Sequence, residues 1–518
     1  MGFEPRLTSR NWKGLLIKPF MDILMERSGW IGCIRVGVLA CIPFDIQGSI
    51  TLKGKLSRRC FLSKIATGAA GLLILRDSQS VRGVPSNEKI NVAIIGIGGR
   101  GRWFLDTIPR MENVVALCDV DNRKLTESVE AAESNEYLTK TKPKKYQDFR
   151  RMLDEMGNQI DAVIVATPDH AHAVIAATAM KKGKHVYVEK PIAHDVAEAR
   201  ALPHIAKQRK VATQMGNQGM ATDSFRRTLE LIEEGAVGEI REAHVWYVFG
   251  GPGQRERPKE KPPVPEYLDW NLWLGPASFR PYHPRYVSGW GAWRDFGTGL
   301  LGGGGSHSIN LAFKALKLGA LWEGVDGAKG QIRVESETPK RCIETFPSQQ
   351  ILRFDFPARG PLPPVRINWY NAPERELQRL GIWQRLEQIV GRSLEWKTGW
   401  TPRSGSLLVG NKGVVHTNAH NSLCSLLPMR DFPNSGGPPQ KLPHVESHLQ
   451  EWIKGCKGGP VHLSNFDHAG PVVELLLLGN VSTLVGQMLE FDPIAMKVVN
   501  NTEADALLSP EHRQGWSL

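Results

Sequence analysis

The stretch NVAIIGIGGRG, residues 91–101, decides the fold of this chain. An apolar, β-rich run leads into a G-x-G-x-x-G pattern formed by Gly96, Gly98 and Gly101. In a dinucleotide-binding turn, these three glycines permit the tight turn, the approach of the pyrophosphate and the close packing of the next helix. A second apolar run, 114–118, ends at Asp119, where an acid can hold a ribose hydroxyl. This context predicts a dinucleotide site rather than a ligand-free glycine turn. The residues expected to contact the cofactor here are Gly96, Ile97, Gly98, Gly99, Arg100, Gly101 and Asp119.

Strand-like and helix-like runs alternate after this turn. The predicted strands are 90–95, 114–118, 161–166, 185–188 and 210–213, and the predicted helices are 101–109, 123–132, 170–182 and 195–208. A β-α-β order of this kind builds a doubly wound parallel sheet, whose ligands lie at the carboxyl ends of the strands. We therefore expect an α/β fold with an N-terminal Rossmann domain.

Length and composition indicate more than one domain. A chain of 518 residues with 41% apolar residues can form two cores, and we place the Rossmann domain at 89–214 and a second domain at 215–518. The formal charge is +12, but its basic residues are scattered, which argues against nucleic-acid binding. Seven cysteines without a C-x-x-C spacing argue against a zinc site, and we expect no metal.

Residues 1–88 read as a leader. Ser57-Arg58-Arg59-Cys60-Phe61-Leu62-Ser63-Lys64, followed by the apolar run 65–75, resembles a twin-arginine export signal. The run is too short for a membrane span, so we expect export to the periplasm or extracytoplasmic space and no stable span in the mature protein. Because 56 residues precede Ser57, where this motif begins, we expect the true start to lie downstream of Met1. An ordinary basic leader is the alternative.

Three further motifs follow predicted strands. Thr167-Pro168-Asp169 can simply end a strand and cap the next helix. Lys190, in Glu189-Lys190-Pro191, can be a solvated loop residue as readily as a catalytic one. Gln214-Met215-Gly216-Asn217-Gln218 reads as a polar turn when taken alone.

Taken in this order, the motifs resemble the glucose-fructose oxidoreductase / inositol dehydrogenase family, Gfo/Idh/MocA. The resemblance covers residues 89 to the C-terminus and implies a second, α+β domain with an open, mostly antiparallel sheet that covers the nicotinamide. It implies that Lys190 assists proton transfer at the substrate hydroxyl and that the bond before Pro191 is cis. It also implies homo-oligomerisation through the exposed face of that sheet. The additional cofactor contacts implied by the resemblance are Thr167, Pro168, His172, Glu189, Lys190 and Asn217.

The second domain carries aromatic and polar loops around residues 269–286. Tyr282 and His283 are candidate substrate contacts, because sugars need stacking faces and hydroxyl partners. The alternative is that the aromatic residues of these loops only staple them together. The apolar run 472–485 predicts a buried core helix rather than a membrane span.

One position departs from the family pattern. Members commonly carry an Asp four residues before a His, on one face of a helix. Here His307 occupies the His position, Gly303 the Asp position, and Asp295 lies eight residues too early to replace it. Lys190 and His307 are thus the candidate catalytic and substrate-binding residues. The four consecutive glycines at 302–305 predict a mobile segment.

The resulting expectation is an NAD-dependent oxidoreductase acting on a sugar or polyol. Asp119 favours NAD, since an acid repels the 2′-phosphate of NADP. Because Arg100, Arg102 and Arg123 lie nearby in the sequence, NADP remains an alternative cofactor. Two alternatives remain. One is a glycosidase that uses NAD transiently, through oxidation and elimination. The other is a cofactor-bound carbohydrate-binding protein whose catalysis is impaired by Gly303.

Overall fold

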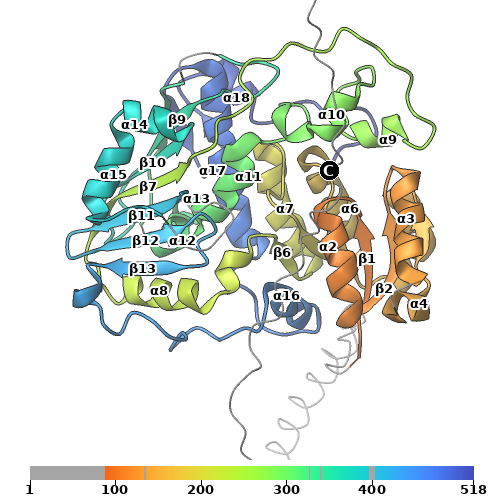
Figure 1. The fold of residues 1–518 in the computed structure, drawn as a ribbon, viewed down its shortest axis with the longest axis horizontal. Helices are drawn as coiled ribbons and strands as arrows, with labels where there is room; N and C mark the ends of the chain where they lie inside the picture. The colour runs from red at the N-terminus through yellow and green to blue at the C-terminus, as the bar shows by residue number, and fades with distance from the viewer. Residues whose placement is uncertain (1–87, 134–135, 326, 339–340, 396–402) are drawn as a thin grey trace, which may run out of the picture. The chain divides into compact units, whose positions relative to one another are not determined.

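The computed structural model describes residues 88–518 apart from 134–135, 326, 339–340 and 396–402. The predicted leader lies outside these residues. The first sheet has six parallel strands in the order β3-β2-β1-β4-β5-β6, which confirms the Rossmann fold (Figure 1). Its strands are β1 Asn91–Ile95, β2 Asn113–Cys118, β3 Lys144–Tyr146, β4 Ala162–Val165, β5 His185–Val188 and β6 Thr213–Met215. The strand order reverses between β1 and β4, which is where such sheets bind ligands.

Helices cover both faces of this sheet. They are α2 Arg100–Thr107, α3 Asn122–Glu133, α4 Glu136–Thr141, α5 Phe149–Met156, α6 Asp169–Lys181 and α7 Val196–Arg209. The predicted helices agree with α2, α3, α6 and α7 to within about two residues at each end. The predicted strand 210–213 was wrong in position, because Lys210 forms the left-handed C-cap of α7 and the strand starts only at Thr213. The short edge strand β3, which is rich in lysine, was not predicted.

The second sheet has nine strands in the order β13-β12-β11-β7-β10-β9-β8-β14-β15. All its neighbours pair antiparallel except β7 and β10, so it is mixed and mostly antiparallel, as the resemblance implied. The strands are β7 Ile240–Tyr247, β8 Ile332–Ser336, β9 Gln350–Phe356, β10 Val365–Asn371, β11 Gly405–Gly410, β12 Val414–Asn418, β13 Cys424–Leu427, β14 Leu489–Asp492 and β15 Lys497–Val498.

Helices pack on the inner face of the second sheet, toward the Rossmann domain (Figure 1). The central one, α17, packs along α7 and against β8, and it buries almost its entire length. Among the described residues it is also the one helix long and apolar enough to cross a membrane, but 83% of its apolar window is buried inside the fold. It is therefore a core helix, as predicted for 472–485. The helices on this side are α8 Asp223–Glu233, α11 Gly299–Ser308, α12 Asn310–Ala315, α13 Ala320–Glu323 and α17 Phe466–Val485.

Two helices lie on the opposite, outer face of this sheet: α14 Glu374–Arg379 and α15 Ile382–Val390 (Figure 1). Trp383 and Leu386 of α15 pack in one apolar cluster with Trp246 of β7 and Tyr370 of β10. Beyond them the face carries ion pairs between neighbouring strands, such as Arg366 with Asp355. The face that the resemblance assigns to oligomerisation is thus partly covered by the chain itself, and oligomerisation stays a prediction.

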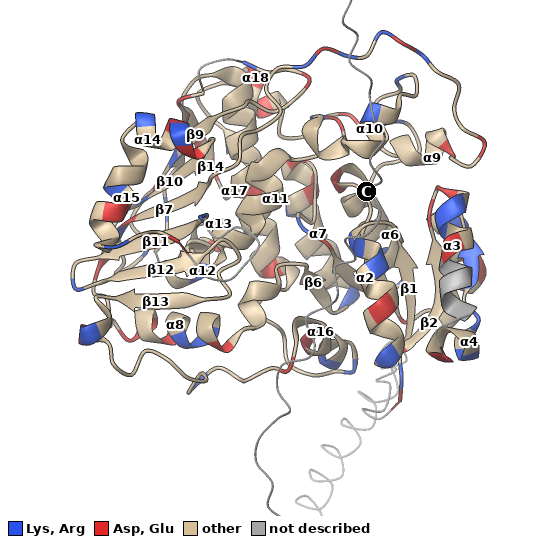
Figure 2. Ribbon diagram, in the orientation of Figure 1, with Lys and Arg blue, Asp and Glu red and all other residues tan. Residues whose placement is uncertain are grey.

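Segments from the far C-terminal part of the chain return to the Rossmann domain. Trp452 of α16, His448–Cys456, packs beside Tyr187 of β5. Trp516 in the C-terminal tail packs against Phe149 and lies under the guanidinium of Arg150. Charges of both signs are interspersed on the surrounding helices, whereas α17 is almost free of them (Figure 2). The remaining helices are α9 Trp270–Leu274, α10 Pro284–Ser288 and α18 Thr502–Ala506.

Candidate active site at the switch point of the Rossmann sheet

The glycine turn is closed by backbone contacts that leave no room for side chains. Gly96 has φ +80°, and a Cβ there would lie 2.7 Å from the carbonyl carbon of Ala166, which follows β4. A Cβ on Gly101 would overlap the carbonyl oxygen of Gly96. The N–H of Gly101 donates to the carbonyl of Gly98 at 2.7 Å, which brings α2 directly against β1. The turn has the shape that a dinucleotide requires.

The surroundings of the turn fit a bound nucleotide. Helix α2 begins at Arg100 with neither a side-chain cap nor an acidic residue in its first turn, so its N-terminal dipole faces the glycines uncompensated. Asp119, buried at the end of β2, accepts a hydrogen bond from the N–H of Ile97 at 3.0 Å. Burial raises the pKa of Asp119, although the charge of Lys124, 3.7 Å away, opposes the shift. The N-terminus of α2 and the carboxylate of Asp119 therefore lie where the sequence predicted a phosphate and a ribose contact, respectively.

The three arginines that could have bound the 2′-phosphate of NADP are each paired with a carboxylate. Arg100 donates to Glu189 at 3.0 Å, and Arg123 pairs with Asp121 at 2.8 Å. Arg102 lies 3.9 Å from Asp106, one turn along α2. This arrangement leaves Asp119 as the group predicted to meet the ribose, where an acid favours NAD.

The loops after β4 and β5 meet at the same edge of the sheet. The ring nitrogens of His172 lie 2.7 Å and 2.8 Å from the carbonyl oxygens of Pro191 and Thr167, so this buried imidazole holds the two loops together. The Lys190–Pro191 bond is cis, as the resemblance implied. Because Glu189 bonds Arg100, the loop that carries Lys190 stands beside the glycine turn. Contacts of Thr167, Pro168 and His172 with the cofactor stay predictions.

His307 approaches this edge from the second domain, in the last turn of α11. Burial lowers the pKa of His307 well below 6.5, and the charges of Lys190 and His420 add to the effect. Its Nδ1 is buried and has no hydrogen-bond partner within the part of the chain that the structure describes. The site thus combines a cationic Lys190 with a neutral imidazole, a pair that can take a proton from a hydroxyl group.

The glycines before His307 form a helix rather than the mobile segment that the sequence predicted. A Cβ on Gly302 would overlap the side chain of Thr298, and one on Gly304 would lie 3.0 Å from the ring of Tyr247. A Cβ on Gly305 would lie 2.7 Å from Leu476 of α17. These three glycines let α11 fit tightly between its neighbours. Gly303 alone faces open space, with nothing within 4 Å of a Cβ placed there.

Other candidate residues have packing roles in the structure. Asn217 is buried and donates to Asn310 of α12 at 3.0 Å, so its amide ties the loop after β6 to α12. Tyr282 lies edge-on to Trp270 within an aromatic cluster, and His283 caps α10 by accepting from the N–H of Arg285. The stapling role considered for these loops is thus present, and their contact with substrate stays a prediction. Asp295 pairs with Arg280 in the same region.

A segment of the second domain clasps the turn after Asp119. The N–H of Asn122 donates to the carbonyl of Tyr267 at 2.8 Å, and the N–H of Asp269 donates to the carbonyl of Val120 at 3.0 Å. The guanidinium of Arg123 stacks on the Tyr267 ring, 3.4 Å from its centroid. We call residues 265–269 the clasp. It covers the turn where a Rossmann acid holds the ribose.

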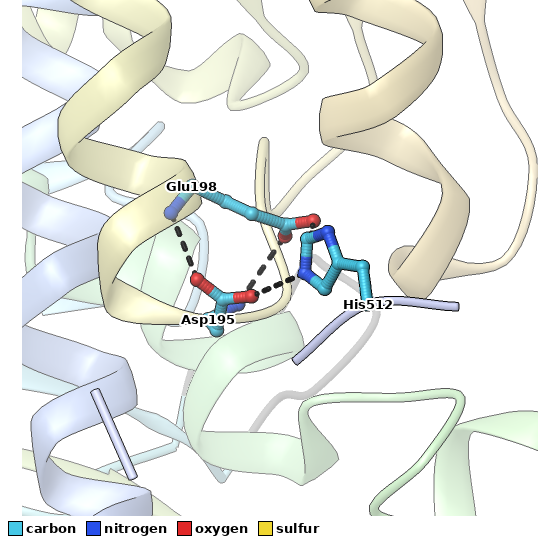
Figure 3. Close-up of side chains that lie close together, drawn as sticks. All are labelled: Asp195, Glu198 and His512. Atoms are coloured by element: carbon cyan, nitrogen blue, oxygen red, sulfur yellow. Dashed lines mark hydrogen bonds and ion pairs between the residues drawn. The ribbon is translucent and has the colours of Figure 1, made fainter. Parts of the chain in front are cut away.

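A buried ionic cluster joins α7 to the C-terminal tail (Figure 3). Asp195 caps α7 by accepting from the N–H of Glu198, and Glu198 accepts in return from the N–H of Asp195. His512 of the tail lies 3.0 Å from Asp195 and 3.5 Å from Glu198. These side chains could offer metal ligands, but their own hydrogen bonds already satisfy the capping box, so we interpret the cluster as a latch for the tail.

Comparisons with known proteins agree with this architecture. Residues 90–217 match an oxidoreductase family, NAD-binding Rossmann fold, and residues 244–316 match its C-terminal alpha/beta domain. The solved structure of the WlbA dehydrogenase from Chromobacterium violaceum, in complex with NADH and UDP-GlcNAcA, aligns with a TM-score of 0.51 at 17% identity. That alignment covers 79% of this chain and 99% of that one. This likeness supports the fold alone.

Curated relatives match in sequence. A glycosyl hydrolase family 109 protein from Shewanella pealeana is 29% identical over 215 residues, or 38% of this chain and 46% of the relative. A second such protein, from Shewanella sp. strain ANA-3, is 31% identical over 202 residues, or 36% and 41%. The chain therefore spans less than half the length of these relatives.

The fold and site define a two-domain protein with an NAD-binding Rossmann domain. The matched domains, in this order, are those of the Gfo/Idh/MocA oxidoreductase family, which these two segments of the chain resemble.

Proposed function

We propose that this protein is an NAD-dependent oxidoreductase acting at a carbinol carbon of a sugar or polyol. The observation that carries the proposal is the unpartnered, buried Nδ1 of His307 beside the charge of Lys190. A neutral imidazole can receive the hydroxyl proton, and the lysine stabilises the oxygen as it loses that proton. Bound NAD would exchange hydride with the carbon. Curated relatives named as glycosyl hydrolases support a sugar-like substrate.

The clasp favours a second candidate, a glycosidase that keeps its NAD. Two backbone hydrogen bonds and the Arg123–Tyr267 stack hold residues 265–269 over the ribose-binding turn. A nucleotide held in this way leaves slowly, which suits a reaction that oxidises a substrate and then reduces its product on the same cofactor. The net reaction is hydrolysis of a glycosidic bond with no accumulation of NADH. Relatives named as family 109 glycosyl hydrolases support this candidate.

The first test is to identify the nucleotide carried by the purified protein. Denaturation followed by mass spectrometry should release NAD in near-stoichiometric amount. The protein is then supplied with NAD and a panel of hexoses, uronic acids and polyols, and separately with p-nitrophenyl N-acetyl-α-galactosaminide. NADH formation supports the first candidate, and nitrophenol release without net NADH supports the second. Failure to bind NAD(H) would overturn both, and ligand binding without turnover would indicate the impaired binding protein.

Lys190→Met tests the catalytic assignment. Loss of the ammonium should lower turnover by about 10²- to 10⁴-fold. The affinity for NADH, measured by fluorescence titration, should change less than about threefold, because the glycine turn and Asp119 carry nucleotide binding. Turnover that survives the change would remove Lys190 from the mechanism.

We further propose that the protein is exported by the twin-arginine pathway. The Ser57–Lys64 pattern and the apolar run after it support this. Fusing residues 1–88 to a folded reporter should direct the reporter to the periplasm of a Gram-negative host. Replacing Arg58 and Arg59 by lysine should retain it in the cytoplasm, and unchanged export would refute the pathway.

A further inference from the structure

His420 lies against His307, although no sequence motif singled it out. It sits in the turn between β12 and β13, and its ring meets that of His307 edge-on, with the centroids 4.6 Å apart. The only local signal is a histidine in a polar Asn-Ala-His-Asn turn. Such a turn reads as a solvated loop, so local sequence could not have identified the residue.

The turn that carries His420 is fixed to α11, which carries His307, and to α12, which follows it. The side-chain oxygen of Asn421 accepts from the N–H of Leu311 at 3.0 Å, just after α11. The Asn421 amide also donates to Thr417 at 2.7 Å. The hydroxyl of buried Tyr247 lies 3.0 Å from the carbonyl of Gly304 and 3.3 Å from that of Ala419. The Tyr247 hydroxyl therefore links the backbone of Ala419, the residue before His420, to helix α11, which carries His307. This contact helps to fix the position of one imidazole ring relative to the other.

The charges around the pair show which protonation states they hold. Beyond burial, Lys190, His420, Arg100 and His448 act on His307, and all of these groups are neutral or cationic. Burial and then Lys190 also lower the pKa of His420. Both rings are therefore neutral near pH 7. A neutral imidazole has one donor and one acceptor nitrogen, so two of them can pass a proton without creating a buried charge pair.

We propose that His420 is the positioning partner of His307, replacing the carboxylate that is absent at Gly303. The inference rests on the proposed oxidoreductase function. The hydroxyl proton of the substrate passes to the imidazole pair while the carbon loses hydride, for which bound NAD⁺ would be the acceptor. Half-buried His420 then transfers a proton to solvent. One C–H and one O–H bond are broken, one C=O double bond forms, and one proton is released. The rings are in edge-on contact without a direct hydrogen bond between them, so proton transfer from one to the other, and with it the choice of His307 tautomer, requires a bridging water or a small ring rotation.

The first experiment needs no substrate. The full chain is labelled with ¹⁵N- and ¹³C-histidine, and the ring signals are assigned through loss in His307→Gln and His420→Gln. In His420→Phe, which keeps a ring but removes its nitrogens, the ¹⁵N shifts of His307 should show a changed tautomer population. The exposed control His204→Gln should leave them unchanged. Identical His307 shifts and titration in His420→Phe would overturn the proposal.

The second experiment uses the best substrate from the panel described above. His420→Phe should lower kcat by about 10- to 100-fold and shift the acidic limb of its pH profile, as loss of an orienting partner does. NADH affinity should stay within about twofold, and His420→Gln should recover part of the rate. An unchanged profile would refute the role of His420 while the proposed function stands. Absence of wild-type turnover would refute the proposed function instead, and the tautomer measurement would still decide whether the rings are coupled.

Discussion

Two glycine runs face the candidate site from opposite domains, and they serve different purposes. At Gly96, Gly98 and Gly101 the absence of a side chain lets the backbone of the turn pack closely on neighbouring backbone and leaves space for a nucleotide. At Gly302, Gly304 and Gly305 the absence of a side chain lets a helix pack closely on its neighbours, and all three residues lie within helix α11. The same residue type thus builds a ligand cradle in one place and a tight helix contact in the other. What a Cβ would meet at each position distinguishes the two cases.

The largest effect on nucleotide binding is expected in the first run. In Gly101→Ala the new methyl group overlaps the Gly96 carbonyl and must open the turn. We expect NADH affinity to fall by about 100-fold, equivalent to about 2.8 kcal/mol, as measured by calorimetric titration. Gly157→Ala, at a glycine with open space around its Cβ position, is the control and should bind as the wild type does. Unaltered binding in Gly101→Ala would show that the turn is not the cradle.

Neighbouring residues of the second run offer a matched pair. The methyl group of Gly302→Ala overlaps buried Thr298, whose hydroxyl donates to Asp169 at 2.6 Å. Overpacking of this kind should cost about 1–3 kcal/mol of unfolding free energy. Gly303→Ala meets nothing and should gain about 0.5–1 kcal/mol from helix propensity. Chemical denaturation measures both, and equal effects at the two positions would refute the packing account of these glycines.

Local sequence placed most of the Rossmann half because the buried strands β1, β4 and β5 are each followed closely by a strong breaker. Gly96, Pro168 and Pro191 each stop an apolar run, so strand ends, and with them the site, could be placed. The edge strand Lys144–Tyr146 and the polar strand Thr213–Met215 lack that apolar signal, and one was missed and the other misplaced. Periodicity identifies a buried strand, but it cannot identify a strand formed by pairing alone.

The second-domain half of the site depends on contacts between distant residues. His420 reaches His307 through a turn that is fixed by Asn421 and Tyr247, and no spacing in the sequence encodes that contact. The packing of α16 and of Trp516 on the Rossmann domain is likewise set by long-range burial. The glycine run was predicted as mobile because glycine's local freedom was weighed without the neighbours that remove it.

The clasp sharpens the comparison by testing how firmly the first run holds its nucleotide. Tyr267→Ala removes the ring that stacks on Arg123 and loosens the cover over the ribose turn. The rate at which bound NAD is released is measured by adding an excess of labelled NAD. In Tyr267→Ala this rate should become about tenfold faster, equivalent to about 1.4 kcal/mol. Tyr137→Ala, at an exposed tyrosine on α4, is the control. An unchanged release rate would remove the support that the clasp gives to the glycosidase candidate.

The last prediction concerns the latch that holds the C-terminal tail on the Rossmann domain. Burial, with Asp195 beside it, raises the pKa of Glu198 to about 8 from 4.5. The folded protein therefore holds a proton on Glu198 that the unfolded chain loses above about pH 4.5, and stability must fall as pH rises toward 8. The hydrogen bond to Asp195 raises the pKa of His512, so its stabilising contribution is also lost with rising pH.

Glu198→Gln keeps the neutral form at every pH and should flatten this dependence. Between pH 5 and 8 the unfolding free energy of the wild type should fall with rising pH more steeply than that of Glu198→Gln. The two slopes should differ by up to about 1.4 kcal/mol per pH unit, which is the effect of one proton. Chemical denaturation at a series of pH values measures the difference, and hydrogen exchange around Trp516 reports whether the tail is released first. If both proteins lose stability with the same slope, Glu198 ionises freely, and the tail is held by the packing of Trp516 on Phe149 rather than by the buried proton.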